Sequence, residues 1–447
     1  MSVRSNFVKA SIALAVAALP LAARAAGETT VPAPAIKTVD GATIVQQSDE
    51  RLPLVGIELV VRAGLDRQTL KQNGLAALVA AAILHTPVTQ AAGEPPVPLD
   101  EAIAANGGSV HITVDPTDVR FYVEALSIDA PAVIDLFRRA LATPDFSPAT
   151  MRAARAALVA QIADSQGYAL QVGIDMLNAA SSSQANAGMP SLGTPASLAQ
   201  LLPSDAQAFY RTYYRRGGSY VSAAGRLDSI NADALSSIAQ ALPEGNTLPV
   251  NVRVPPLHGA SREIVTHRDI ASPWLIAQYA APGVDSRDFG AMLVLSAFVK
   301  RTLADIAQVP GVVSETFASR AVGAVYSYDR SPARLVLYVN GGIGNPTRAF
   351  ATALSVVNVL AATRLEGSID QFKAQAAGDF ATSATTLETR AWLATVFARS
   401  STSPDYLDRA LRAISSVTAE DVQRVARTYL GKPTIALVLP RSGSLQN

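Results

Sequence analysis

The chain has no cysteine and only four histidines among its 447 residues. The absence of cysteine excludes disulfides, thiolate metal sites, iron–sulfur clusters and a cysteine nucleophile. Charged residues make up only 16% and hydrophobic residues 49%, which excludes a generally disordered chain. The 37 basic and 36 acidic residues nearly balance, which argues against a surface for nucleic acid. A chain of this length predicts two or more domains with sizeable cores.

Residues 1–25 have the pattern of a secretory signal peptide. Two basic residues lie near the start, an apolar run follows over 10–23, and Ala23-Arg24-Ala25 offers an A-x-A cleavage site. A membrane anchor is the weaker interpretation, because Pro20 interrupts the run and a span needs about 20 apolar residues. We expect cleavage after this segment, export to a bacterial periplasm, and no membrane span in the mature chain.

The chain repeats part of itself. The stretches 202–213 and 418–429 share Asp, Gln, Arg, Thr and Tyr at a common offset of 216 positions. Earlier in each half, a predicted strand (53–64 and 273–283) precedes a helix rich in alanine and leucine (74–84 and 289–306). Self-similarity of this kind predicts a duplicated domain of roughly 210 residues.

The predicted fold class is α+β, with a domain at 27–245, a linker rich in proline and glycine at 246–256, and a second domain at 257–447. Runs rich in β-branched and aromatic residues predict strands, and longer alanine-rich stretches predict helices. In the first half the strands are 57–62, 119–126 and 220–224, and the helices are 129–142, 147–164 and 204–214. We expect the domains to face each other with sheets inside and helices outside, forming one half of a clamshell.

Several motifs, taken in their order and spacing, resemble the pitrilysin/insulinase metallopeptidases, which include mitochondrial processing peptidase subunits. They are Gly74-Leu75-Ala76, Asn106-Gly107-Gly108 with the strand 118–122, Leu192-Gly193-Thr194, and the helix within 416–430. The resemblance runs over essentially the whole chain after the signal segment. It implies the family's two-domain fold and descent from a peptidase.

The resemblance also implies where the family's zinc site would lie. In active members the two histidines of an H-x-x-E-H motif and a later glutamate bind zinc, and the glutamate within the motif activates water. Here Ala77, Ala80 and Ala81 stand at the motif positions, and Gln161 stands at the later glutamate. Methyl groups cannot bind a cation, and an amide substitutes poorly for a carboxylate. We therefore expect no cofactor, no zinc and no peptidase activity from this chain by itself.

Two further family features bear on substrate binding. An Arg and a Tyr seven residues apart, which hold the substrate backbone in the family, fall on Ala307 and Ser314; a shifted register would nominate Arg320 and Tyr326. The predicted strand after Gly108 carries His111 where the family has Asn. If that strand lies at a sheet edge it can bind a peptide through its backbone. An ordinary internal strand is the alternative.

Three hypotheses for function remain open. The first is an inactive subunit that pairs with a zinc-bearing homologue to form a peptide-binding or peptidase chamber. The second is a stand-alone peptide-binding or scaffold protein of the cell envelope. The third is an active zinc endopeptidase with an unrecognised site.

Overall fold

The computed structural model describes residues 32–165, 167–181, 186, 188–248, 262–307, 322–329, 332–340, 368–400 and 404–441. The predicted signal peptide, most of the predicted linker, Ser314 and Arg320 lie outside the described residues. No helix in these ranges is both long enough and apolar enough to cross a bilayer.

The first half of the chain builds a six-stranded sheet with the strand order β1-β2-β8-β3-β7-β6. Strands β2 and β8 are parallel, and all other neighbours are antiparallel. The strands are β1 (Ala35–Val39), β2 (Ala42–Ser48), β3 (Leu54–Val61), β6 (Ser109–Val114), β7 (Val119–Leu126) and β8 (Tyr220–Gly225), and a separate hairpin joins β4 (Pro87–Val88) to β5 (Val97–Pro98).

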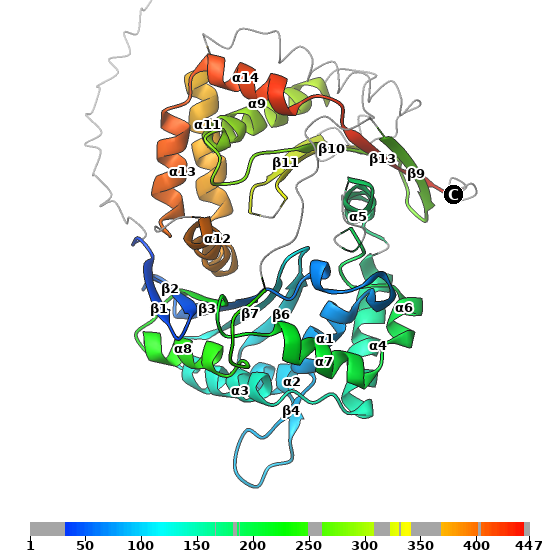
Figure 1. The fold of residues 1–447 in the computed structure, drawn as a ribbon. Helices are drawn as coiled ribbons and strands as arrows, with labels where there is room; N and C mark the ends of the chain where they lie inside the picture. The colour runs from blue at the N-terminus through cyan, green and yellow to red at the C-terminus, as the bar shows by residue number, and fades with distance from the viewer. Residues whose placement is uncertain are drawn as a thin grey trace, which may run out of the picture.

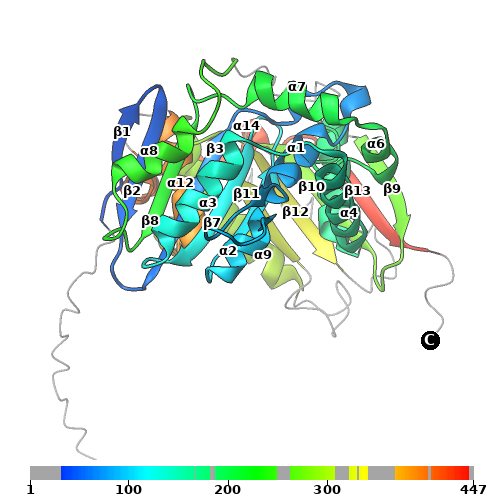
Figure 2. The same ribbon diagram turned by 90° about the horizontal axis from the view of Figure 1, so that it is seen from below.

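Helices cover the outer face of this sheet, as Figures 1 and 2 show. They are α1 (Leu75–Leu84), α2 (Leu99–Ala105), α3 (Ala130–Ala142), α4 (Pro148–Ser165), α6 (Pro195–Gln200), α7 (Pro203–Tyr213) and α8 (Ala232–Gln240), with short 3-10 turns at Leu65–Arg67 and Leu70–Gln72. Helix α5 (Ala169–Ser181) departs from this layer and lies toward the second half of the chain.

The second half builds a five-stranded sheet with the order β11-β12-β10-β13-β9. Its strands are β9 (Arg262–Arg268), β10 (Trp274–Ala280), β11 (Val322–Ser327), β12 (Arg334–Asn340) and β13 (Thr434–Pro440). Its helices are α9 (Phe289–Ala307), α11 (Ile369–Ser383), α12 (Leu387–Ser400), α13 (Tyr406–Ser415) and α14 (Ala419–Tyr429). All of these helices except α12 lie on the side of the sheet away from the first half (Figure 1).

The two sheets share one topology. Read from β9, the second sheet runs β9-β13-β10-β12-β11, which matches β2-β8-β3-β7-β6 of the first. In both sheets the first pair is parallel and the remaining pairs are antiparallel. Each sheet is therefore laid out in the same order by its own half of the chain.

The repeated stretches found in the sequence form helices α7 and α14, which begin in the same way. Asp205 accepts a hydrogen bond from the backbone N–H of Leu202 (2.9 Å), and Asp421 accepts one from the backbone N–H of Thr418 (3.2 Å). These carboxylates satisfy amide groups that the first turn of a helix leaves without a partner. The shared Asp in the sequence is thus a helix-start signal.

The predicted elements agree with the structure, with end shifts of a residue or two at most sites. The helices predicted at 74–84, 129–142 and 289–306 are α1, α3 and α9, and the strand predicted at 119–126 is β7. The mixed α+β class is confirmed. One expectation needs correction: not all helices lie outside the sheets, because α5 and α12 lie between them.

Each half sends one helix onto the inner face of the other half's sheet. Helix α12 packs on β8, β3 and β2 of the first sheet, and α5 packs on β13, β10 and β9 of the second. Both helices lie between the sheets in Figure 1. A small apolar cluster joins Ala169 and Leu177 of α5 to Ile276, Val336 and Val438 of the second sheet. The exchange fixes the two halves against each other.

Candidate functional site

The three positions on α1 that the family resemblance assigns to the zinc motif lie in a buried helix. Ala77 and Ala80 are fully buried, and Ala81 is 4% exposed. They belong to α1, where every residue except Leu84 is buried, and α1 packs against α4 and α7. Gln161 lies on α4, but its side chain is exposed. The structure thus brings three methyl groups together on α1 and turns the only polar member of the set toward solvent.

The donor chemistry at this position does not fit zinc. Zinc in proteins takes nitrogen, sulfur or carboxylate oxygen ligands, and three of the four side chains here have none. Within the described ranges, no group of three or more His, Asp or Glu side chains is arranged to hold a metal ion. Two of the described histidines lie beside carboxylates: His85 lies 3.7 Å from Asp100, and His111 lies 2.9 Å from Glu388.

Two motifs that carry the family resemblance meet at the start of α1. Gly74, the residue before the helix, has a φ of +90°, and Gly193 has a φ of +77°. A Cβ atom on Gly193 would lie 2.7 Å from the Cα of Gly74, so neither backbone leaves room for a side chain. The Gly74-Leu75 and Leu192-Gly193 motifs, which are far apart in the sequence, therefore contact each other directly through their backbones.

The substrate-binding positions are placed only in part. Ala307 is the last residue of α9, while Ser314 lies outside the described residues. Tyr326, nominated by the shifted register, is buried and donates a hydrogen bond to the carbonyl of Pro282. Its hydroxyl is therefore engaged within the protein.

The strand that follows Gly108 is β6, at one edge of the first sheet, so it is not an internal strand. Its pairing within the described ranges is with β7. The side chain of His111 lies beside Tyr122, with ring centroids 5.2 Å apart, and its Nε2 lies 2.9 Å from Glu388 Oε1 on α12. The edge position is what backbone recognition of a peptide needs, and peptide binding there stays a prediction.

The inner face of the first sheet carries an unusual number of polar side chains. Side chains alternate along β3, so Val55, Ile57 and Leu59 enter the first core while Glu58 points to the second half. On β7, Arg120 shares that inner face. Arg120 donates to Glu58 Oε1 and to Asp115 Oδ2, each at 3.1 Å, and all three side chains are less than a tenth exposed.

Helix α12 is tied to this polar face along its whole length. Arg390 donates to Gln47 (2.9 Å) and to Asp49 (2.6 Å). Trp392 packs its ring 4.2 Å from the Arg120 guanidinium, a cation–π contact. Arg399 donates two hydrogen bonds to Asp118, at 2.9 and 2.8 Å. These contacts link residues 272 to 343 positions apart in the chain and hold the two halves together.

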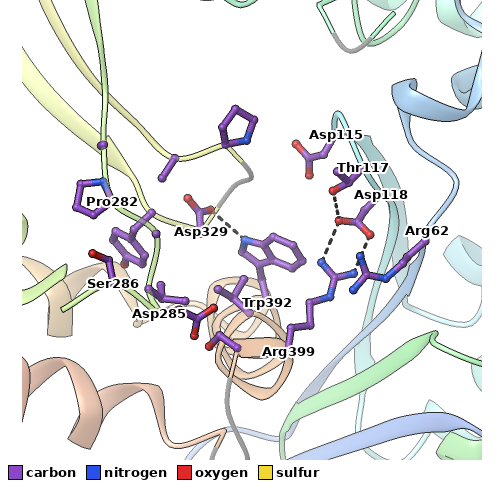
Figure 3. A pocket seen from close by; sticks show the side chains of 18 of the residues that line it. Arg62, Asp115, Thr117, Asp118, Pro282, Asp285, Ser286, Asp329, Trp392 and Arg399 are labelled. Carbon is purple, nitrogen blue, oxygen red and sulfur yellow. Dashed lines mark hydrogen bonds and ion pairs between the residues drawn. The ribbon is translucent and has the colours of Figure 1, made fainter. Parts of the chain in front are cut away.

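A cavity of about 500 Å³ opens beside these contacts, between the two halves. Figure 3 shows Arg62, Thr117 and Asp118 of the first half on one side and Asp285 and Asp329 of the second half on the other. Trp392 and Arg399 of α12 lie between them. Burial would raise the pKa of Asp118, but the charge and hydrogen bonds of Arg399 outweigh burial and lower it, so this wall keeps an ionised carboxylate.

Glu58 is a buried carboxyl group on this inner face, and burial is the largest influence on its pKa. Burial raises the pKa of Glu58 to about 8, against an opposing effect of the Arg120 charge. Its Oε2 atom is buried and accepts no hydrogen bond. A carboxyl group in this setting is held protonated at neutral pH.

We expect Glu58→Gln to change how stability depends on pH. Between about pH 4.5 and about 8 the folded chain keeps the Glu58 proton that the unfolded chain has released, so the free energy of unfolding falls as pH rises. The slope is about 1.4 kcal/mol per pH unit for one fully linked group. Because glutamine stays neutral, the free energy of unfolding of the variant should not fall in this way. It should therefore rise relative to that of the wild type through this range and be the larger of the two at pH 9. Urea unfolding from pH 5 to 9 measures the difference. Parallel curves for the two proteins would show that Glu58 is ionised in the folded chain.

Sequence reasoning missed this polar face and both exchanged helices. The signal was present in the alternation of the strands, with Glu58 and Arg62 at even spacing along one strand and Arg120 and Glu124 along another. Alternating charges inside apolar strands indicate a second, polar contact face. This alternation does not show which helix covers the polar face of the first sheet.

Comparison with known proteins gives a family for part of the chain and a fold for most of it. Residues 43–195 match the model of the insulinase family, peptidase family M16. A comparison with curated proteins found no match.

Several solved structures share the fold. A peptidase M16 inactive domain from Pseudomonas fluorescens matches with a TM-score of 0.75 at 16% identity, covering 92% of this chain and 98% of its own. A protease from Helicobacter pylori matches with a TM-score of 0.71 at 13% identity, covering 92% and 100%. A chain of complex III2 from Candida albicans with Inz-5 bound matches with a TM-score of 0.73 at 14% identity, covering 92% and 97%. The match over residues 43–195 makes that part of the chain similar to the insulinase family, and the solved structures show that most of the chain shares their fold.

Proposed function

We propose that this chain is a catalytically inactive insulinase-type subunit that pairs with a zinc-bearing homologue around a chamber for peptides. The observation that carries the proposal is the chemistry of α1, where Ala77, Ala80 and Ala81 are buried methyl groups at the family's ligand and base positions. We propose that the chain binds no zinc there. The fold around that position is kept, which supports selection for shape and not for chemistry.

Two features support a role as a partner. The exchanged helices lock the halves of the chain together, so a chamber that opens and closes would need a second chain. The similar structures include one described as an inactive domain and one chain of a multi-subunit complex. A stable complex of two such chains would bury more than about 1,000 Å².

The test is purification from the native host with metal analysis, size measurement and a peptidase assay. We expect the chain to co-purify with a homologue that carries H-x-x-E-H, and we expect zinc and activity to follow the homologue alone. Stoichiometric zinc on this chain, lost with peptidase activity on adding a chelator, would overturn the proposal and favour an active endopeptidase.

A stand-alone peptide-binding or scaffold protein is the second candidate. It is favoured by the open edge strand β6 and by the replacement of the family's Arg and Tyr at Ala307 and Ser314. A chain that runs only as a monomer, and whose deletion leaves the homologue's peptidase activity unchanged, would select this candidate.

We also propose export and domain duplication. The signal-like segment 1–25 supports export to the periplasm, and N-terminal sequencing of the mature protein tests it. The shared strand order and directions of the two sheets support duplication of an ancestral domain. The equivalent placement of α7 and α14, each ending shortly before the interior strand β8 or β13, supports the same proposal.

A further inference from the structure

We propose that the cavity between the halves binds a small zwitterionic peptide, with its carboxylate at Arg62, its ammonium groups at Asp285 and Asp329, and its apolar part against Trp392. The cavity lies within one chain, so the proposal holds whether or not the chain has a partner. Its volume of about 500 Å³ is that of a pocket for a small molecule or a short peptide.

The first wall of the cavity carries Arg62, Asp115 and Asp118, and Asp115 accepts a hydrogen bond from Arg120 at 3.1 Å. Asp118 is matched by the two hydrogen bonds from Arg399, and Arg62 lies close enough to lower the Asp118 pKa as well. Arg62 itself makes no hydrogen bond or ion pair with any described residue, although its side chain is half-buried. A half-buried guanidinium that makes no hydrogen bond to a described residue can bind a carboxylate through two parallel hydrogen bonds.

The opposite wall carries surplus negative charge. Asp285 lines the cavity with its side chain exposed to solvent, and it forms no hydrogen bond or ion pair within the described ranges. Asp329 accepts one hydrogen bond, from Trp392 Nε1 to its Oδ2 at 2.9 Å, and its Oδ1 accepts none from described residues. Figure 3 shows these two carboxylates across the cavity from Arg62. The cavity therefore has a positive and a negative side.

The surface between the charged walls is apolar and fixed. Trp392, Val396 and Pro282 line it, and the Trp392 ring is held by Arg120 on one face and by its bond to Asp329. A ring that is already held loses little freedom when a ligand packs on it, so the site is arranged before binding. A ligand with opposite charges at its two ends and an apolar middle matches all three surfaces.

The dipeptide Lys-Phe is the probe, because it has two ammonium groups, one carboxylate and an aromatic ring. The chain has two tryptophans, so Trp274→Phe leaves Trp392 as the sole reporter in the cavity. We expect Lys-Phe to change Trp392 fluorescence in a saturable way. We expect Lys-Phe amide, which lacks the carboxylate, to bind at least about tenfold more weakly.

Substitutions assign each wall. In the same background, Arg62→Gln should weaken Lys-Phe binding by about tenfold or more and leave amide binding unchanged, while Asp285→Asn should weaken both. Arg301→Gln, an exposed arginine of α9 paired with Asp305, is the matched control and should change neither. No saturable signal, equal affinity for acid and amide, or an unchanged affinity in Arg62→Gln would each overturn the proposal.

Discussion

Replacing Ala80 by glutamate is expected to cost at least about 4 kcal/mol of unfolding free energy, enough to leave much of the chain unfolded. Ala80 is fully buried on a helix that packs against α4 and α7. Glutamate there needs volume that the core does not have and places a carboxyl group among apolar side chains. Urea unfolding and the soluble fraction on expression measure the effect.

The matched control is Ala160→Glu on the exposed face of the neighbouring helix α4. The same substitution there should change stability by less than about 0.5 kcal/mol. Near-equal stability of Ala80→Glu and the wild type would mean that α1 borders water, and the inactive-subunit proposal would lose its main support.

Rebuilding the whole ligand set tests function at the same place. A chain with Ala77→His, Ala80→Glu, Ala81→His and Gln161→Glu should bind no stoichiometric zinc. Metal ligands need partners that orient them and space for water, and α1 is surrounded by apolar packing. Tight zinc binding by this variant would contradict the expectation and show that the metal site is lost only in its ligands.

Replacing Arg390 by methionine is expected to lower the unfolding free energy by about 3–5 kcal/mol. Arg390 and Asp49 are 4% and 9% exposed in their side chains and lie 2.6 Å apart. The pKa of Asp49 is held well below its usual range, first by the hydrogen bond from Arg51 and also by Arg390. Without Arg390, a largely buried carboxylate keeps only the exposed Arg51 as partner.

The loss of stability in Arg390→Met should appear in both halves of the chain. Hydrogen exchange should speed up in α12 and in the β1–β2 hairpin together, because Arg390 joins them through Gln47 and Asp49. Arg412→Met is the control, since Arg412 is 73% exposed and pairs with Asp408 of its own helix, where about 0–1 kcal/mol is expected. A change confined to α12 would show that the pair does not couple the halves.

Local patterns in the sequence determined most of the elements. The helix at 75–84 was predictable because an alanine- and leucine-rich run follows a glycine, and β7 because β-branched and aromatic residues run from Val119 to Leu126. The sequence also predicts the loss of the zinc ligands, since the side chains of Ala77, Ala80 and Ala81 have no donor atoms. These inferences depend on residues close together in the chain.

The sequence indicates only in part that the first sheet has a second, polar contact face. Side chains alternate along β3, so Glu58 lies on the opposite face from Val55, Ile57 and Leu59. This indicates that one face of the strand is apolar and the other carries a polar group. The alternation does not show that Arg120 on β7 donates a hydrogen bond to Glu58, or that Trp392 packs on Arg120. A charged residue within an apolar strand indicates that the folded protein must supply a partner for it, but the sequence does not identify that partner.

The exchange of α5 and α12 was decided by the tertiary structure alone. The sequence places α5 in the first half and α12 in the second, and each would satisfy its helix pattern against either sheet. At Gly173, α5 lies close to the second sheet: a Cβ there would lie 2.0 Å from Ile276 Cδ1, so a larger residue would require the Ile276 side chain to move. Such fit between surfaces far apart in the chain exists only once both sheets have formed, because packing complementarity is a property of three-dimensional shape and has no local sequence period.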